Sequence, residues 1–139
     1  MKSKRVILDT NLWISFLISK KYNTIDNLLD NGDIIFIFSE ESLEEFVTVA
    51  RRPKISSYIP ESALEEILSL FNKYGKLIQV VSNVDECRDP KDNFLLSLAI
   101  DSNADYLVTG DSDLLILKQI KNTRIIKWNE FLKEINKLL

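Results

Sequence analysis

The sequence predicts an α/β protein, a three-layer α/β/α sandwich built around a central parallel sheet of about five strands. Two observations lead to this prediction. Short and nearly continuous apolar runs, typical of parallel strands buried on both faces, recur along the chain. Longer stretches with helical periodicity separate these runs. A strict alternation of strand and helix favours one sheet with helices on both of its faces.

The predicted strands share an apolar, largely β-branched composition without a clean alternation of inward and outward residues. They are Arg5–Leu8, Ile34–Phe38, Leu77–Val81, Tyr106–Val108 and Thr123–Lys127. The predicted helices share apolar residues spaced three or four positions apart. They are Leu12–Ser19, Thr24–Asn31, Glu40–Arg52, Glu61–Lys73, Asp92–Ser102, Ser112–Gln119 and Asn129–Leu138.

Residues that start and stop helices stand at the boundaries of these elements. Ser39 is placed to cap the helix that follows it, and Pro60 stands in a first helical turn. Gly32 and Gly75 follow predicted helix ends, where glycine is frequent. The stretch from Ser82 to Pro90 is polar and rich in turn formers, so we expect it to be a loop.

The length of 139 residues fits one domain, residues 1–139, with a substantial core. No apolar run approaches the ~18 residues that a membrane span needs. The basic start of the chain is followed by only a short apolar run before an acid, which argues against a signal peptide. The single cysteine, Cys87, cannot pair within the chain. These features lead us to expect a cytoplasmic protein without membrane contact.

The chain contains no histidine, and this excludes several classes of catalytic site. Ser-His-Asp and Cys-His mechanisms are impossible, and so are zinc sites that depend on imidazole. Any hydrolytic chemistry must therefore use carboxylates, hydroxyls, lysines or a hard metal ion.

Three aspartates are predicted to meet at the carboxyl edge of the sheet, where open parallel α/β sheets bind ligands. Asp9 ends the first strand, and Asp111 follows the fourth in YLVTGDSDLL. Either one alone is most simply a turn former or a helix N-cap. Asp92, in DPKDNFLLSLA, shares a helix face with Leu95 and Leu96, so its carboxylate is expected to point inward at the same edge.

A fourth acid is expected from the helix SEESLEEFVTVARR, but periodicity leaves its identity open. Glu44 and Glu45 flank the apolar stripe of this helix at about equal angles. Carboxylates gathered at one edge repel each other unless a cation joins them. All-oxygen ligands favour Mg²⁺ or Mn²⁺, and such ions support hydrolysis of phosphodiesters. The acids therefore predict metal-dependent phosphoryl chemistry.

These motifs also stand in the order of a known family. They are ILDTN, SLEEFVTVARRPK, RDPKDNFLLSLAIDSNADYLVTGDSDLL and RIIKWNEFL, and together they span nearly the whole chain. The chain resembles the PIN domain and, within it, the VapC-like toxins of bacterial and archaeal toxin–antitoxin pairs. The resemblance implies a PIN-like, Rossmann-like fold and an endoribonuclease that uses Mg²⁺ or Mn²⁺ and leaves a 5′-phosphate.

The resemblance also assigns roles to residues. The catalytic and metal-binding acids fall on Asp9, Glu45, Asp92 and Asp111. Glu45 is preferred over Glu44 because the pattern E-x-x-x-x-x-R-x-P-K registers on Glu45, Arg51, Pro53 and Lys54. The polar positions that would orient or assist the carboxylates fall on Asn11, Thr109 and Asp113, the last acting through water.

The net charge of −3 gives no support to nucleic-acid binding at first sight. The four proposed ligands contribute −4 to it, however, so the rest of the chain sums to +1. A filled metal site would leave the protein mildly cationic. Candidate contacts to the RNA backbone are Lys20, Lys21, Arg51, Arg52 and Lys54, although each is more simply explained as a solvated surface residue.

The resemblance therefore implies a ribonuclease that is the toxin of a toxin–antitoxin pair, with RNA as substrate and an antitoxin as partner. A catalytically silent PIN scaffold that binds RNA or a protein stays open as an alternative. A metal-dependent phosphohydrolase of the haloacid-dehalogenase kind is a further one, although the residues after Asp9 lack the second acid of its D-x-D motif. A homodimer also stays open. Trp13, Phe16 and Leu17 are candidates for its interface or for an antitoxin contact, but we expect them to pack in the core.

Overall fold

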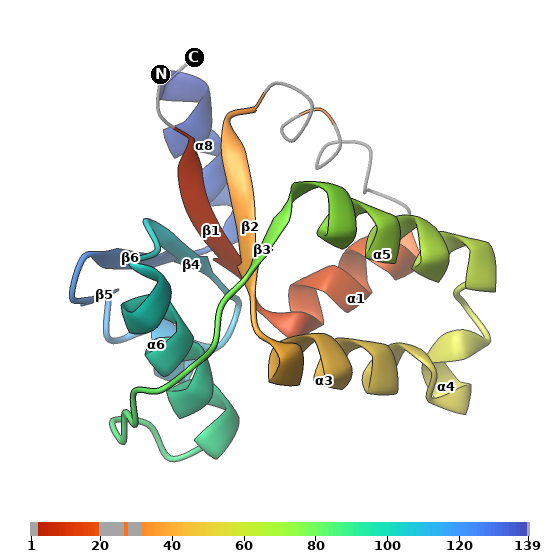
Figure 1. Cartoon of the computed structure of the whole chain (residues 1–139), viewed down its shortest axis with the longest axis horizontal. Coiled ribbons are helices and arrows are strands. Elements are labelled where there is room, and N and C mark those ends of the chain that lie inside the picture. Colours follow the sequence, from red (N-terminus) through yellow and green to blue (C-terminus); the bar gives the residue numbers. More distant parts are fainter. Residues whose placement is uncertain (1–2, 20–26, 28–31, 139) are drawn as a thin grey trace.

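The computed structural model of the chain describes residues 3–19, 27 and 32–138 (Figure 1). Its centre is a six-stranded sheet. In chain order the strands are β1 (Lys4–Leu8), β2 (Ile34–Phe38), β3 (Gly75–Leu77), β4 (Tyr106–Val108), β5 (Gln119–Ile120) and β6 (Thr123–Ile126). Their spatial order is β3-β2-β1-β4-β6-β5, and every neighbouring pair is parallel except β5 and β6. The predicted α/β fold is confirmed, with a short antiparallel edge strand added.

Helices cover both faces of this sheet. They are α1 (Thr10–Ser19), α3 (Glu40–Ala50), α4 (Pro53–Ser56), α5 (Glu61–Tyr74), α6 (Pro90–Ser102), α7 (Ser112–Leu115) and α8 (Trp128–Leu138). Val6 and Leu8 of β1 pack into the core formed with α1, α3, α5 and α8, whereas Ile7 packs with α6 and α7. In Figure 1, α1, α3 and α5 lie together on one side and α6 lies on the other. Within the described residues, no helix is long and apolar enough to cross a membrane.

The apolar residues of α1 face the core, as expected. Trp13, Phe16 and Leu17 are each no more than 6% exposed, so they offer little surface to an antitoxin or a second copy. The Trp13 ring packs against Phe36 of β2 and Phe71 of α5, with ring centroids 4.8 Å and 4.7 Å apart. Contacts of this kind contribute about 0.5–1.5 kcal/mol each beyond the burial of their area. They fix α1, which directly follows Asp9, against the sheet.

A capping box starts α3 at the end of β2. The side chain of Ser39 accepts a hydrogen bond from the N–H of Ser42 at 3.0 Å, and the Ser42 hydroxyl accepts one from the N–H of Ser39 at 2.9 Å. Ser39 is fully buried, so these bonds satisfy groups that water cannot reach. The box fixes the direction in which α3 leaves the sheet and therefore the position of Glu45.

The third strand is shorter and begins earlier than the predicted Leu77–Val81. The N–H groups of Val81 and Ser82 donate to Oδ2 of Asp101, at 2.7 and 2.8 Å, in place of a strand ladder. Residues 78–89 therefore run as a loop toward α6 instead of continuing along the edge of the sheet. The predicted loop is present but starts sooner.

The helix predicted at Ser112–Gln119 was also wrong at its C-terminal end, because α7 stops at Leu115. Lys118 and Lys121 adopt left-handed backbone conformations, with φ of 64° and 50°. They turn the chain so that β5 pairs with β6. A lysine gives no signal for such a conformation, which non-glycine residues rarely adopt.

The helix predicted at Glu40–Arg52 ends at Ala50, and a short helix, α4, follows it. Arg52 is extended, with φ −61° and ψ 138°, as is usual for a residue before proline. Pro53 then stands at the first position of α4, where its missing N–H costs nothing. The helix predicted at Thr24–Asn31 lies outside the described residues, apart from Asn27.

Candidate metal centre and active site

A cleft of about 210 Å³ opens at the carboxyl edge of the sheet. All four acids that the sequence singled out line it, and each comes from a different segment. Asp9 follows β1, Glu45 lies on α3, Asp92 lies in the first turn of α6, and Asp111 precedes α7. Because α3 and α6 belong to opposite layers, the cleft is built from both sides of the sheet.

The structure distinguishes the two glutamates that periodicity could not separate. Glu44 is exposed, whereas Glu45 is half-buried and lines the cleft. The Thr10 hydroxyl donates to Oε2 of Glu45 at 3.5 Å, and Nζ of Lys91 lies 3.1 Å from Oε1. Glu45 is thus held between α1 and α6.

The Thr109 hydroxyl joins two of the acids. It donates to Oδ2 of Asp9 at 2.8 Å and accepts from the N–H of Asp111 at 3.0 Å, and Thr109 is only 1% exposed. Burial raises the pKa of Asp9, the Thr109 bond opposes that rise, and the charges of Asp111 and Glu45 add to it. Asn11 reaches Asp9 through its backbone, since its N–H donates to Oδ1 at 3.4 Å.

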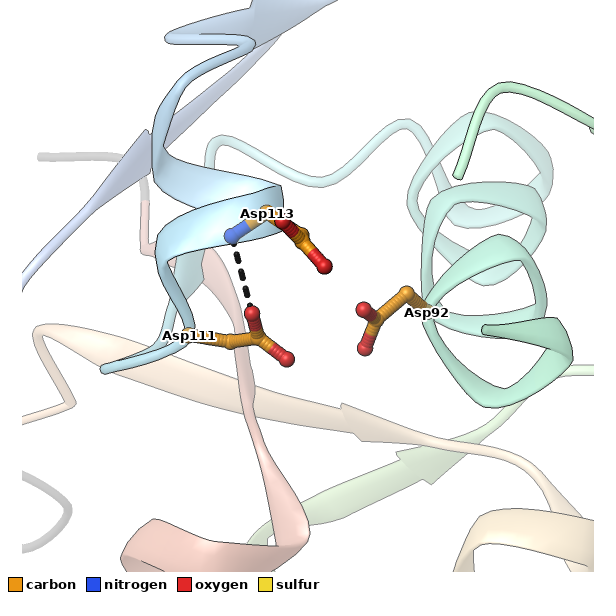
Figure 2. A group of neighbouring side chains, drawn as sticks. All are labelled: Asp92, Asp111 and Asp113. Carbon is orange, nitrogen blue, oxygen red and sulfur yellow. Dashed lines mark hydrogen bonds between the residues drawn. The ribbon is translucent and has the colours of Figure 1, made fainter. Parts of the chain in front are cut away.

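Asp92 is the most buried of the acids. It is 5% exposed, and its Oδ2 has no hydrogen-bond partner within the described part of the chain. Burial first, and then the charges of Asp111 and Asp89, raise the pKa of Asp92 to about 6. Figure 2 shows the Asp92 carboxylate pointing toward those of Asp111 and Asp113, and one oxygen from each lies within 4.8 Å of the others.

Asp113 extends the acidic group formed with Asp92 and Asp111. Its N–H donates to Oδ1 of Asp111 at 2.9 Å, as the dashed line in Figure 2 marks. Its carboxylate accepts from the guanidinium of Arg88 at 3.1 and 3.2 Å. The Arg88 side chain is 88% exposed, so this ion pair is well solvated and contributes little to folding. Asp113 is thus tied to Asp111 through its backbone and to Arg88 through its side chain.

The family model of the PIN domain matches residues 5–113, a range that includes all of these acids. The chain belongs to the PIN domain family. PIN domains are generally nucleases. The convergence of carboxylates described above therefore lies in the part of the chain that defines the family.

Relatives and solved structures support this assignment. Uncharacterized protein MJ1680 from Methanocaldococcus jannaschii is 29% identical, with 97% of this chain and 94% of that protein aligned. The VapBC2 structure from Rickettsia felis, bound to a DNA fragment from their promoter, matches with a TM-score of 0.54 and 22% identity, covering 89% of this chain and 98% of that one. PAE2754 from Pyrobaculum aerophilum matches with a TM-score of 0.62 and 13% identity, covering 97% and 90%. At these identities the two structures share the fold of this PIN domain.

The site of this PIN domain fits a hard divalent cation. Its donors are all carboxylate oxygens, which Mg²⁺ and Mn²⁺ prefer. The unpartnered Oδ2 of Asp92 is an acceptor that the protein leaves unsatisfied, and native structures rarely tolerate such an atom without a reason. A cation held by Asp92, Asp111 and a neighbouring carboxylate would satisfy this atom and relieve the repulsion that adds to burial in raising the pKa of Asp92.

Of the three described basic residues proposed to contact RNA, one lines the cleft of this PIN domain. Arg52 lines it. Arg51 instead pairs with a glutamate of α5 at 3.4 Å, and Lys54 is exposed on α4. Lys20 and Lys21 lie outside the described residues.

Two further charged residues, Lys91 and Asp89, line the cleft although the sequence did not single them out. Lys91 is paired with Glu45, and Asp89 caps α6, with its Oδ1 accepting from the N–H of Lys91 at 2.9 Å. The signal was available, because Asp89 followed by Pro90 is a typical helix start. Residues in the same first turn as Asp92 must lie beside it.

The raised pKa of Asp92 predicts a pH dependence of stability in the metal-free protein. Because the pKa rises from 3.8 to about 6 on folding, the folded state binds more protons between these values. The free energy of unfolding should therefore fall as pH rises through this range, and the loss should persist above it. We expect Asp92→Asn to melt higher than the wild type at pH 7 in EDTA, by a few degrees, and to show a shallower pH dependence.

Thermal melts from pH 4 to pH 8 measure this effect. Asp85→Asn is the matched control, because Asp85 is an exposed acid outside the cleft and should keep the pH dependence of the wild type. Equal slopes for the wild type and Asp92→Asn would contradict the assignment of a destabilising carboxylate to Asp92.

The two hydrogen bonds of the Thr109 hydroxyl predict that Thr109→Val and Thr109→Ser differ in stability and in Mn²⁺ affinity. Thr109→Val removes the donor to Asp9 and the acceptor for the N–H of Asp111, and we expect a loss of about 1–3 kcal/mol in the free energy of unfolding. Mn²⁺ affinity should also fall, by about 10- to 100-fold, because Asp9 is no longer oriented. Thr109→Ser keeps both bonds and should behave like the wild type. Urea unfolding and calorimetric Mn²⁺ titration measure the two effects, and unchanged Mn²⁺ binding in Thr109→Val would show that the hydroxyl does not position the acids.

Proposed function

We propose that this PIN domain is a Mg²⁺- or Mn²⁺-dependent endoribonuclease and the toxin of a toxin–antitoxin pair. The observation that carries the proposal is the convergence of carboxylates from four segments around Asp92, a buried acid with one unpartnered oxygen. Such a group destabilises the metal-free fold. That cost is explained if the group binds a cation for hydrolysis of phosphodiesters.

The chain's own residues would divide the work at this site. Asp9, Glu45, Asp92 and Asp111 would hold the ion, and Thr109 would keep Asp9 oriented through the bond described above. A bound Mg²⁺ or Mn²⁺ supplies positive charge at the scissile phosphate and lowers the pKa of water there. Hydrolysis with the 3′-oxygen as leaving group would give a 5′-phosphate.

Basic side chains that line the cleft would bind the phosphates of the RNA backbone. Arg52 and Lys91 both line the cleft, and their side chains can contact phosphates without selecting a sequence. Asp113 would assist through water next to Asp111, with Arg88 beside it. The assignment of RNA as substrate and of an antitoxin as partner draws on the resemblance to VapC-like toxins. The fold shared with the VapBC2 structure is consistent with it.

The nuclease proposal predicts metal-dependent cleavage that requires Asp9. The wild type should cut single-stranded RNA in Mn²⁺ or Mg²⁺ and not in EDTA, and Asp9→Asn should reduce cleavage to background because it removes one ligand charge. In the same buffers, metal at a hundred times its dissociation constant should stabilise the wild type by ~2.7 kcal/mol. Gel-based single-turnover assays and thermal melts measure the two effects.

Asp85→Asn serves again as the control, since it removes an exposed acid and should cut like the wild type. Normal cleavage by Asp9→Asn would remove Asp9 from the site. Metal-induced stabilisation without any cleavage by the wild type would favour the silent PIN scaffold over the nuclease.

The toxin proposal predicts growth arrest that depends on the same acid. Expression of the wild type in a bacterial host should stop growth, and expression of Asp9→Asn should not. Co-expression of the product of a short open reading frame adjoining this gene should restore growth and yield a complex that co-purifies with this chain. Arrest by Asp9→Asn would show that toxicity does not arise from cleavage.

A further inference from the structure

A second hollow, of about 240 Å³, adjoins the acidic cleft between α3 and α6. The two share Glu45, Lys91 and Leu95 as lining residues, so the hollow lies directly beside the cleft. Two helical stripes face each other across it. Glu41 and Glu45 are four residues apart on α3, and on α6 Lys91 lies three residues before Phe94, so each pair is on one face of its helix.

The lining of the hollow differs in character from that of the cleft. Pro90, Phe94 and Leu95 give it an apolar wall, and the half-buried Phe94 ring is its aromatic surface. The rim carries two carboxylates, Glu41 and Glu45, of which Glu45 is paired with Lys91 at 3.1 Å. Acidic groups at the rim repel a phosphate but can accept hydrogen bonds from the amino and imino groups of a base.

We propose that this hollow binds an unpaired nucleobase of the RNA next to the scissile phosphate, stacked on Phe94. The inference rests on the proposed nuclease function and adds a base-binding subsite to it. A base in a duplex has both of its faces covered by neighbours, whereas a base in a single strand can be splayed out onto an aromatic side chain. The site therefore selects single-stranded RNA, with the base in the hollow and the phosphate in the cleft.

Cleavage kinetics test the stacked base. Phe94→Leu keeps an apolar side chain of similar size but removes the aromatic face, and it should lower kcat/KM on single-stranded RNA about tenfold, mainly through KM. Phe94→Tyr keeps the ring and should cut like the wild type. An abasic nucleotide at the stacked position should slow the wild type by a similar factor and should have little further effect on Phe94→Leu. Tyr58→Leu is the matched control, because Tyr58 is 67% exposed outside both hollows.

A binding measurement separates this inference from the nuclease proposal. RNA carrying 2-aminopurine at the stacked position should lose fluorescence on binding the wild type in Mg²⁺, and the loss should be absent with Phe94→Leu. Melting temperatures of the variants show whether each one is folded. Quenching that depends on Phe94 in a protein that does not cut RNA would support the base site and overturn the nuclease.

Two results would overturn the base site while leaving the nuclease intact. One is equal cleavage by the wild type and Phe94→Leu when Asp9→Asn is inactive. The other is unchanged cleavage and quenching in Phe94→Leu together with loss of antitoxin binding, which would assign the hollow to a protein partner.

Discussion

Repulsion among the acids at the carboxyl edge of the sheet is the constraint on which the rest of the site depends. Asp92 is buried beside Asp111 with one oxygen unpartnered, and Asp9 lies within reach of both charges. Several groups compensate for this arrangement. Thr109 donates to Asp9, the N–H of Asp113 donates to Asp111, and Lys91 neutralises Glu45. Each compensation acts on an acid that surrounds Asp92, and none reaches its free oxygen.

The two layers of the fold bring these groups together. β1 is central to the sheet, and alternate side chains along it pack into the two cores. Asp9 therefore follows a strand that is fixed from both faces of the sheet. The N–H of Asp9 donates to the carbonyl of Val108 at 3.0 Å, which ties the end of β1 to the segment that carries Thr109 and Asp111. Asp92 then enters from the α6 layer and Glu45 from the α3 layer. A shift of either layer would open the site.

The sequence was most informative where burial decides conformation. Ile34–Phe38 and Tyr106–Val108 are strands with the predicted bounds, because both runs are largely enclosed by helices on two faces. The prediction failed where a single local interaction determines the backbone conformation. The N–H groups of Val81 and Ser82 donate to Asp101 in place of a strand ladder, and Lys118, three residues beyond the end of α7, adopts a left-handed conformation before β5. Neither residue type signals this. At the site, the sequence predicted three aspartates correctly as lining residues. Asp9 and Asp111 follow strands, and Asp92 lies on the apolar face of a helix. The choice of Glu45 required the family pattern, and the ion pair of Lys91 with Glu45 was missed because it joins residues of two layers that are far apart in the sequence.

An acidic cleft is a poor receptor for a polyanion until a cation is present. In the proposed function, therefore, the divalent ion must bind before RNA or together with it, because four carboxylates would otherwise face the scissile phosphate. Arg52 and Lys91 are too few to reverse that field, and Lys91 is already engaged by Glu45. Part of the affinity must then come from contacts that do not depend on charge. The apolar wall formed by Pro90, Phe94 and Leu95 lies beside the cleft and can supply such a contact to a base. Stacking of the base on this wall would hold the nucleotide in place while a divalent cation binds beside its phosphate.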